Sequence, residues 1–467
     1  MNIRNPRTGL EDYKLQVDSA QQIELSTHDI RAAQISWHEK GVAYRVDVIS
    51  KWLSEIKKAE KEIVAALTSD TGRENLSRLE FNAICGLLQG WMFAAPNLLK
   101  QKEVRASETN PTVDILQQLS PYALVGVISP WNFPLLLALM DTIPALLAGS
   151  GVILKPSEVT PRFIDPLEKT IKAVPELNAI IKLARGAADT GKAIVQQVDA
   201  LCFTGSVATG RKIAAACADR FIPAFLELGG KDPAIVLPDA DIDMATDAIL
   251  RSCAGAGGQA CQSLERIYVH SSLHDEFIEV LTQKAKQVTL NTTSINDGIL
   301  GPIIFKNQAE IIDAHVQDAL AKGAKKIGDD VLENNTGGIW ARPIILTNVD
   351  HTMDVMRNET FGPLMPIMSF DKIEEAIRLA NDSIYGLSAS VFSKDVEQAI
   401  EVASKIDAGA ISINDGSLTT KVFDAEKNAF KYSGMNGSRM GEAGLMRFFR
   451  KKAILIQRDR PQRIDEV

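Results

Sequence analysis

The sequence of 467 residues lacks the features that mark several large classes of protein. It has five cysteines but no Cys-x-x-Cys pair and no His-x-x-x-His spacing, so a structural zinc site is not expected. The N-terminus, MNIRNPRTGLEDYKL, is too polar for a secretory signal. An odd number of cysteines without such a signal favours a reducing compartment, and we expect a cytoplasmic protein without a metal ion.

Long apolar runs and clusters of positive charge are also scarce. The longest apolar stretch, residues 133–149, is interrupted by Asp141, Thr142 and Pro144, so it does not predict a membrane span. The formal net charge is −8, and the nearest thing to a basic cluster is the short run at residues 450–452. Phosphate backbones require clustered Lys and Arg, so neither a membrane nor a nucleic acid is an expected partner.

What the sequence does contain is an alternation of helical and buried-strand patterns. The first hundred residues show apolar side chains at helical spacing, and Gly72 marks the end of one helix. Later apolar runs are typical of buried strands, at residues 123–129, 151–155, 200–205, 233–237, 266–270, 366–370 and 410–414. Helical patterns between such runs predict βαβ units with parallel sheets, in two α/β domains joined near Gly229.

One cysteine has unusual neighbours. Cys261 lies in the glycine-rich stretch GAGGQACQSLER, whereas a cysteine that only fills a core is usually surrounded by apolar residues. The other four fall in helical or strand patterns and are interpreted as core residues: Cys85, Cys202, Cys217 and Cys253.

Two motifs that follow predicted strands could bind a nucleotide. FTGSVATGRK carries Gly205 and Ser206 at the start of a helix, whose N-terminal N–H groups attract phosphate, although a plain strand-to-helix turn fits equally well. KPSE carries Lys155, which could hold a ribose or a phosphate, and Glu158, which could accept hydrogen bonds from ribose hydroxyls. The motif could also simply begin a charged helix.

Two further motifs could take part in acyl chemistry. PWNFP fixes Asn132 between prolines, which suits an oxyanion hole but also suits an ordinary turn. ELGGK carries Glu227 in an apolar stretch, which suits a general base but also suits a solvated glutamate at the end of a strand.

The order of these motifs resembles that of the aldehyde dehydrogenase superfamily. The series PWNFP, KPSE, FTGS, ELGGK and GQAC is followed by ETFGP at residues 359–363, and Glu227 precedes Cys261 by 34 residues. The resemblance extends from residue 5 to residue 455 and implies an α/β fold: a Rossmann-like cofactor domain, an α/β catalytic domain and a small β oligomerisation element. The implied bounds are 1–102 and 121–228 (cofactor-binding), 103–120 (oligomerisation hairpin), 229–446 (catalytic) and 447–467 (oligomerisation arm).

The resemblance also implies a mechanism that uses NAD, with NADP possible. Cys261 attacks the aldehyde to give a thiohemiacetal, and Asn132 and the Cys261 backbone N–H hold the oxyanion. Hydride transfer leaves a thioester, and Glu227 activates the water that hydrolyses it. The implied cofactor-binding residues are Trp131, Lys155, Glu158, Gly205, Ser206, Leu228, Glu359 and Phe361. We expect NAD⁺ to be preferred, because a carboxylate at Glu158 would repel a 2′-phosphate.

The substrate is less constrained. By resemblance, the aldehyde tunnel is lined by Phe133, Leu137, Met140, Ala260 and Gln262. This wall is apolar and carries no arginine, so we expect medium-chain or aromatic aldehydes to be favoured over semialdehydes with a carboxylate. The segment 415–430 departs from the family pattern, however, and could supply a cation such as Lys421 or Lys427. Asp141 stands where many hydrolytic members have a lysine.

Two other functions stay open at this point. One is an acylating dehydrogenase that passes the thioester to coenzyme A, although such enzymes generally lack a base at Glu227. The other is a non-catalytic structural or binding protein on the same scaffold. Whichever holds, the β-leaning stretch 103–119 and the apolar strand 453–456 predict a homodimer or homotetramer, because pairing across subunits would cover their edges.

Overall fold

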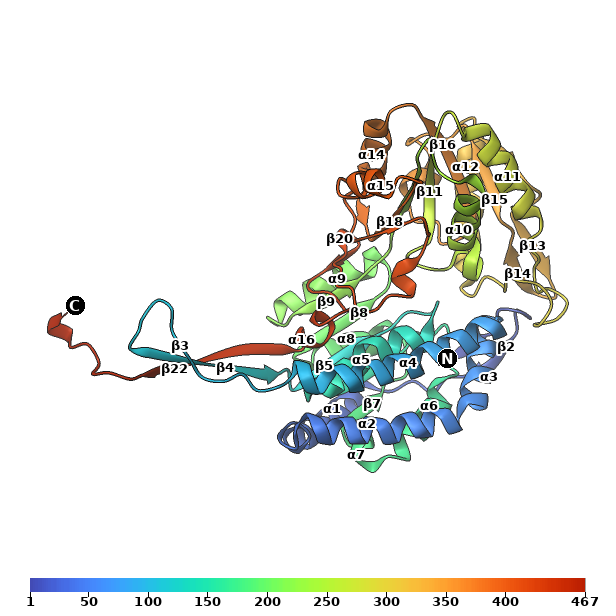
Figure 1. The fold of residues 1–467 in the computed structure, drawn as a ribbon. Coiled ribbons are helices and arrows are strands. Elements are labelled where there is room, and N and C mark those ends of the chain that lie inside the picture. Colours follow the sequence, from blue (N-terminus) through green and yellow to red (C-terminus); the bar gives the residue numbers. More distant parts are fainter. Residues whose placement is uncertain (467) are drawn as a thin grey trace.

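The computed structural model describes residues 1–466. The chain forms two α/β lobes and a projecting arm (Figure 1). As the apolar spacing predicts, the first hundred residues are mainly helical. Helix α3 ends at Gly72, whose φ of 67° is a left-handed conformation that favours glycine. The elements of this region are β1 (Asn2–Arg4), β2 (Glu11–Lys14), α1 (Ala20–Glu39), α2 (Gly41–Lys58), α3 (Glu60–Thr71) and α4 (Glu74–Leu98).

A six-stranded sheet with the order β21-β9-β8-β5-β6-β7 forms the centre of the first lobe. Its strands are β5 (Leu124–Ile128), β6 (Gly151–Lys155), β7 (Ile181–Leu183), β8 (Ala200–Thr204), β9 (Ala224–Glu227) and β21 (Gly434–Met435). All neighbours are parallel except β21 and β9. Its helices are α5 (Pro134–Ala148), α6 (Ile164–Lys172), α7 (Pro175–Asn178), α8 (Ala188–Val195) and α9 (Val207–Asp219).

The second lobe is built on a seven-stranded sheet with the order β12-β15-β16-β11-β10-β18-β19, in which only β12 runs antiparallel to its neighbour among the described strands. Its strands are β10 (Asp232–Val236), β11 (Leu264–His270), β12 (Lys325–Ile327), β15 (Ile344–Thr347), β16 (Leu364–Phe370), β18 (Ser388–Phe392) and β19 (Ala410–Ile413). Its helices are α10 (Ile242–Ala254), α11 (His274–Lys286), α12 (Lys306–Ala321), α13 (Asp354–Arg357), α14 (Ile373–Asn381) and α15 (Val396–Ala403). The predicted α/β class with parallel sheets is confirmed.

The arm extends away from both lobes (Figure 1). It consists of β22 (Phe449–Gln457) paired antiparallel with β4 (Val113–Pro121), which also pairs with β3 (Arg105–Ala106). Smaller elements are β13 (Leu332–Asn335), β14 (Gly338–Ala341), β17 (Tyr385–Gly386), β20 (Phe430–Lys431), α16 (Ala443–Met446) and the 3-10 turns Gly255–Gly258, Leu418–Thr420 and Ile464–Glu466. None of the helices within residues 1–466 has both the length and the apolar character needed to cross a bilayer.

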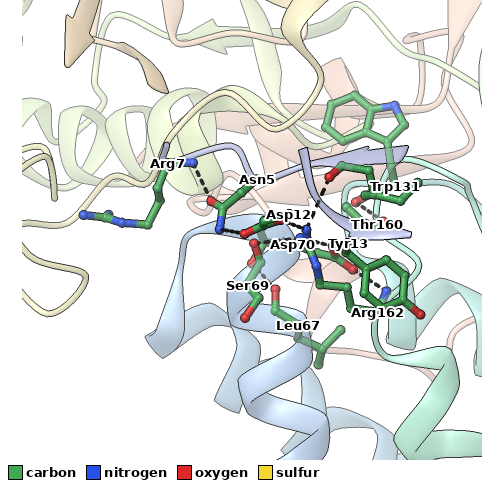
Figure 2. Close-up of polar contacts among 12 residues, drawn as sticks. Asn5, Arg7, Asp12, Tyr13, Leu67, Ser69, Asp70, Trp131, Thr160 and Arg162 are labelled. Carbon is green, nitrogen blue, oxygen red and sulfur yellow. Dashed lines mark hydrogen bonds and ion pairs between the residues drawn. The ribbon is translucent and has the colours of Figure 1, made fainter. Parts of the chain in front are cut away.

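A buried ion-pair network fixes the N-terminal hairpin against the first lobe (Figure 2). Arg162 Nη1 lies 2.8 Å from Asp70 Oδ1, the Arg162 backbone N–H donates to Asp70 Oδ2 at 2.7 Å, and Arg162 Nη2 contacts Asp12. Burial raises the pKa of Asp70 to about 7, although Arg162 opposes the rise. Two residues before Arg162, Thr160 donates to the Trp131 carbonyl at 3.1 Å, which ties this network to the loop that follows β5.

Candidate active site

The topology brings the predicted site residues of the first lobe to one sheet edge. Lys155 and Glu227 end β6 and β9, Asn132 lies in the loop after β5, and Ser206 follows β8. Because β9, β8, β5 and β6 are neighbours in the sheet and run parallel, their carboxyl ends meet at the same edge. A cavity of about 1100 Å³ opens there, and Cys261 of the second lobe also lines it.

The glycine-rich run before Cys261 is needed for the path of the chain. Ala256, Gly257 and Gly258 have positive φ values of 55°, 69° and 71° in succession. A Cβ at Gly258 would lie 2.2 Å from the Gly362 backbone carbon, so a side chain at that position is excluded. The chain leaves this tight path as a turn that presents Cys261, which answers why a cysteine sits among glycines.

The buried Gln259 side chain ties the same loop to the rest of the second lobe. Its Nε2 donates to the Ala256 carbonyl at 3.0 Å and to the Pro302 carbonyl at 3.2 Å, and its Oε1 accepts the Ile304 N–H at 2.8 Å. The Gln259 backbone carbonyl accepts from Asn132 Nδ2 at 3.0 Å. Asn132, which is predicted to hold the oxyanion, is therefore hydrogen-bonded to the backbone two residues before Cys261.

Two buried charged side chains, Arg73 and Glu80, fix the turn that contains Asn132. Arg73 donates to the Asn132 carbonyl, and Glu80 accepts the N–H groups of Leu135 and Leu136 at 2.7 and 2.8 Å. This places a carboxylate at the N-terminus of α5, where the helix dipole favours negative charge. Asn132 is only 3% exposed, so its amide is withdrawn from water and held by its hydrogen bond to the Gln259 carbonyl.

The electrostatics around Cys261 disfavour a free thiolate. Burial raises the pKa of the Cys261 thiol to about 12, and the charge of Lys427 acts in the opposite direction. Three carboxyl groups add to the rise: Glu359, Glu227 and Asp232. At neutral pH the thiol is therefore protonated in the free protein, and attack on a carbonyl requires a proton acceptor.

The cofactor-side residues line the same cavity. Lys155 is 4% exposed and its Nζ contacts Glu158 Oε2 at 3.3 Å and the Pro156 carbonyl at 3.2 Å; burial lowers its pKa, against the effect of Glu158. Ser206 is the N-cap of α9 and accepts the Thr209 N–H at 3.3 Å. A Cβ at Gly210 would lie 2.6 Å from Leu228, so glycine lets α9 approach β9 closely.

Glu359 reaches the cavity from the second lobe. Its Oε1 accepts the Gly230 N–H at 3.1 Å. Burial raises its pKa to about 8, the charge of Glu265 adds to the rise, and the Gly230 hydrogen bond opposes it. The adjacent Phe361 has a φ of 52°, and its N–H donates to Glu265 Oε1 at 2.8 Å.

Three aromatic rings, those of Trp131, Phe305 and Phe361, form an aromatic cluster in the wall of the cavity. The Phe361 ring lies edge-on to Trp131 with 5.4 Å between centroids, and Phe305 lies 6.0 Å from Trp131. All three rings line the cavity, whose open space, paired Lys155 and Glu158, helix N-terminus and apolar wall fit a dinucleotide.

The predicted tunnel residues have different environments. Leu137 lines the cavity, Met140 is 7% exposed in the packing of α5, and the Phe133 ring lies 5.0 Å from the Arg73 guanidinium carbon. Gln262 contacts Thr419, so its side chain faces the segment 415–430. The assignment of the tunnel, including half-buried Ala260, stays a prediction.

Asp141 belongs to a buried ion-pair cluster. Its carboxylate lies 2.6 Å from Arg439 and also contacts Arg447. Burial alone would raise the pKa of Asp141, but the two guanidinium groups outweigh it and lower the pKa. A carboxylate held in this way is positioned for structure rather than for carrying protons.

Sequence reasoning missed several residues that shape the site. They are Arg73 and Glu80 below Asn132, Gln259 in the cysteine loop, Glu265 below Phe361, and Phe305 in the aromatic cluster. Gln259 could have been found, because it lies inside the quoted cysteine motif. The others lie far along the chain from their partners and carry no local signal.

Comparisons with known proteins agree with this geometry. A family model described as the aldehyde dehydrogenase family matches residues 1–454. The chain belongs to this family. The putative succinate-semialdehyde dehydrogenase (NADP⁺) of Mycolicibacterium smegmatis is 32% identical over 455 residues, which are 97% of this chain and 87% of that protein. The 4,4′-diapolycopene aldehyde oxidase of a Methylomonas species is 33% identical over 92% of this chain and 81% of its own.

Solved structures give the same result. The putative aldehyde dehydrogenase PutA of Anabaena variabilis matches with a TM-score of 0.97 and 46% identity over 99% of both chains. Betaine aldehyde dehydrogenase of Staphylococcus aureus, in complex with NAD⁺, matches with a TM-score of 0.91 and 29% identity over 100% of this chain and 92% of that one. The protein is thus an NAD(P)-dependent oxidoreductase that acts on aldehydes, and the non-catalytic alternative is set aside.

Proposed function

We propose that the protein oxidises its aldehyde to a free carboxylic acid, with Cys261 as nucleophile and Glu227 as base. The observation that carries this proposal is that Cys261 lines one cavity with Asn132, Lys155 and Glu359, although they come from two lobes. When bound, NAD(P)⁺ supplies the hydride acceptor. The remaining chemistry falls to the side chains of this chain.

Because the pKa of the Cys261 thiol is about 12, the base must first accept the proton of this thiol. Cys261 must lose its proton as it attacks the carbonyl carbon, and Glu227, whose charge acts on that thiol, is the acceptor. The oxyanion then accepts hydrogen bonds from Asn132 Nδ2 and from the Cys261 backbone N–H. An oxyanion donor of this kind typically contributes about 10²- to 10³-fold in kcat.

Hydride departure from the thiohemiacetal carbon leaves an acyl group on Cys261. Glu227 first passes the thiol proton to solvent. It then takes a proton from water as the water attacks the thioester carbon, and it returns this proton to the departing Cys261 sulfur, so that the acid and the free thiol are released. Asn132 holds the second oxyanion as it held the first.

The cofactor residues keep the roles that the resemblance implies. Lys155 and Glu158 hold the adenosine ribose, and Gly205, Ser206 and the N-terminus of α9 hold the pyrophosphate. Three further residues contact the nicotinamide side: Leu228, Glu359 and Phe361, with Trp131 packed beside Phe361. NAD⁺ is preferred, because Glu158 is a carboxylate whose side chain is 35% exposed and would repel a 2′-phosphate.

One experiment separates this proposal from acyl transfer to coenzyme A. NADH formation is followed with a panel of aldehydes, with NAD⁺ and NADP⁺ in parallel and with and without coenzyme A. Oxidation without coenzyme A supports hydrolysis, and a strict requirement for it would overturn the proposal. Better efficiency with NADP⁺ would overturn the cofactor preference. The relatives include a putative succinate-semialdehyde dehydrogenase and a 4,4′-diapolycopene aldehyde oxidase, so the panel includes both acidic and apolar substrates.

We further propose a homodimer or homotetramer that works in the cytoplasm. On β22, Leu455 is 67% exposed and Ile454 is 38% exposed, which leaves apolar side chains on a projecting strand. Light scattering at micromolar concentration tests this, and a monomer would contradict it. The five cysteines are free thiols, which supports a reducing compartment.

A further inference from the structure

Lys427 is a buried lysine that differs from the others. Lys155 and Lys231 are also buried, and their ammonium groups lie 3.3 Å from Glu158 and 2.6 Å from Glu265. Lys427 is 7% exposed, yet its Nζ has no hydrogen-bond partner among residues 1–466. An ammonium group that is withdrawn from water without a partner costs several kcal/mol, so its retention calls for an explanation.

The backbone around Lys427 is fixed by a hydrogen bond on one side and by close packing on the other. The Lys427 N–H donates to Ser438 Oγ at 3.1 Å, and the same oxygen accepts the Met440 N–H at 3.0 Å. On the other side, the Asn428 carbonyl packs so closely on Gly409 that a Cβ there would lie 1.5 Å from the oxygen. Both flanks thus hold the residue in place.

Lys427 lies within electrostatic range of the nucleophile. Its charge lowers the pKa of the Cys261 thiol and of the Asp232 carboxyl, so it acts on both groups. A Cβ at Gly230 would lie 2.7 Å from both Asp232 Oδ1 and the Cys261 carbonyl oxygen, which shows how close these two residues are. Asp232 is itself engaged with Ser388, which contacts its Oδ2.

No described side chain supplies the missing anion. Asp232 is within electrostatic range but forms no ion pair with Lys427 in the described part of the chain, and the Cys261 thiol keeps a pKa of about 12 with Lys427 in place. A standing thiolate is therefore not the partner at neutral pH. What remains is a negative charge that arrives with the substrate.

We propose that Lys427 binds the carboxylate of a short oxo acid whose aldehyde group is attacked by Cys261. The assignment rests on the proposed function, because it requires the aldehyde carbon at that thiol. Its physical basis is that a carboxylate completes the hydrogen bonding of the buried ammonium, whereas an alkyl chain leaves it unpaired. It departs from the expectation, based on the apolar wall, that medium-chain or aromatic aldehydes are favoured over short semialdehydes with a carboxylate.

The test compares the wild type with Lys427→Met, which keeps the side-chain length and removes the charge. Three pairs of substrates differ only by the carboxylate: glyoxylate and acetaldehyde, succinic semialdehyde and butanal, and glutaric semialdehyde and pentanal. In the wild type at least one acid should be preferred to its neutral counterpart. The variant should lose about 10- to 150-fold in kcat/KM for that acid, as for a hydrogen bond to a charged group, mainly through KM. The neutral aldehyde should lose less than the acid, because it is affected only through the charge of Lys427 on the Cys261 thiol.

Lys421→Met is the matched control from the same segment. Lys421 is 56% exposed and lies 3.6 Å from Asp415, so its removal should change neither substrate class. An equal loss for acids and neutral aldehydes in Lys427→Met would overturn the proposal. A higher pH for alkylation of Cys261 by iodoacetamide in that variant would then assign Lys427 to the nucleophile.

A binding measurement keeps the proposal separate from the proposed function. If the wild type forms no NADH with any aldehyde, the proposed function fails. Calorimetry with Cys261→Ala protein still tests Lys427, because this variant binds without reacting. Tighter binding of at least one of the three acids than of its neutral counterpart, lost in the double variant with Lys427→Met, supports the carboxylate site, and equal affinities within all three pairs overturn it.

Discussion

Replacement of Gly229 by alanine tests how the two lobes share the cofactor. A Cβ at this position would lie 2.4 Å from Glu359 Oε2 and 2.6 Å from Oε1, closer than real Cβ contacts. Gly229 follows β9 of the first lobe by two residues, whereas Glu359 comes from the second lobe. The new methyl group should therefore push the Glu359 carboxyl away from its position, without touching the nucleophile.

The size of the effect follows from the bond that is lost. Moving the carboxyl by about 1 Å breaks the 3.1 Å hydrogen bond from the Gly230 N–H and leaves this buried donor unpaired, at a cost of about 1 to 3 kcal/mol. If Glu359 binds the cofactor ribose, the same displacement should weaken cofactor binding about 5- to 150-fold. The protein should still fold, because the carboxyl group is the far end of a flexible side chain.

The assay is the Kd of NAD⁺ from quenching of tryptophan fluorescence, together with the KM of NAD⁺ in steady-state turnover. Trp131 lines the cavity and provides a local reporter. Gly86→Ala is the control, since a Cβ there would meet no described atom within 4 Å beyond its chain neighbours and the adjacent backbone of its own helix, and alanine favours the helix. A Kd for NAD⁺ within twofold of the wild type in Gly229→Ala would refute the role of Glu359.

Three further outcomes test the chemistry at Cys261. Cys261→Ala should abolish NADH formation while NAD⁺ still binds, and substantial residual turnover would exclude this nucleophile. Glu227→Gln should retain a first burst of NADH but slow the steady state, and an unchanged steady-state rate would assign the base elsewhere. Because burial raises the pKa of the thiol to about 12, alkylation of Cys261 in the free protein should accelerate about tenfold per pH unit between pH 7 and 10. A plateau in that range would show that the thiol ionises more readily.

Much of the site could be predicted because of strand order. Asn132, Lys155, Ser206 and Glu227 each lie at or after the carboxyl end of a strand, and parallel neighbours bring such ends together. The runs at 123–129, 151–155 and 200–205 are found as β5, β6 and β8. The sequence also contains β7 and β9, which were not identified because short strands lack a distinctive periodic pattern.

The supports of the site could not be predicted in this way. Arg73 and Asn132 are 59 residues apart, and Glu265 accepts from a backbone N–H 96 residues away. β21 lies within the range 229–446 that the resemblance assigns to the catalytic domain. It nevertheless pairs with β9 in the sheet of the first lobe. Such pairs depend on tertiary packing, and a single sequence gives no local sign of which charges will meet.

Lys421 and Lys427 show the same limit for the substrate. The two lysines look alike in the sequence, but only Lys427 is buried without a partner in residues 1–466. A hydrogen bond to its charge is worth about 1.5 to 3 kcal/mol, and each buried CH₂ about 0.8 kcal/mol, so the carboxylate balances roughly two to four methylenes. The kcat/KM for succinic semialdehyde should therefore exceed that for butanal. Longer alkyl aldehydes, which bury extra methylenes against Leu137, should recover the difference in kcat/KM. The buried cation thus favours short substrates with a carboxylate, and the apolar wall favours longer alkyl aldehydes.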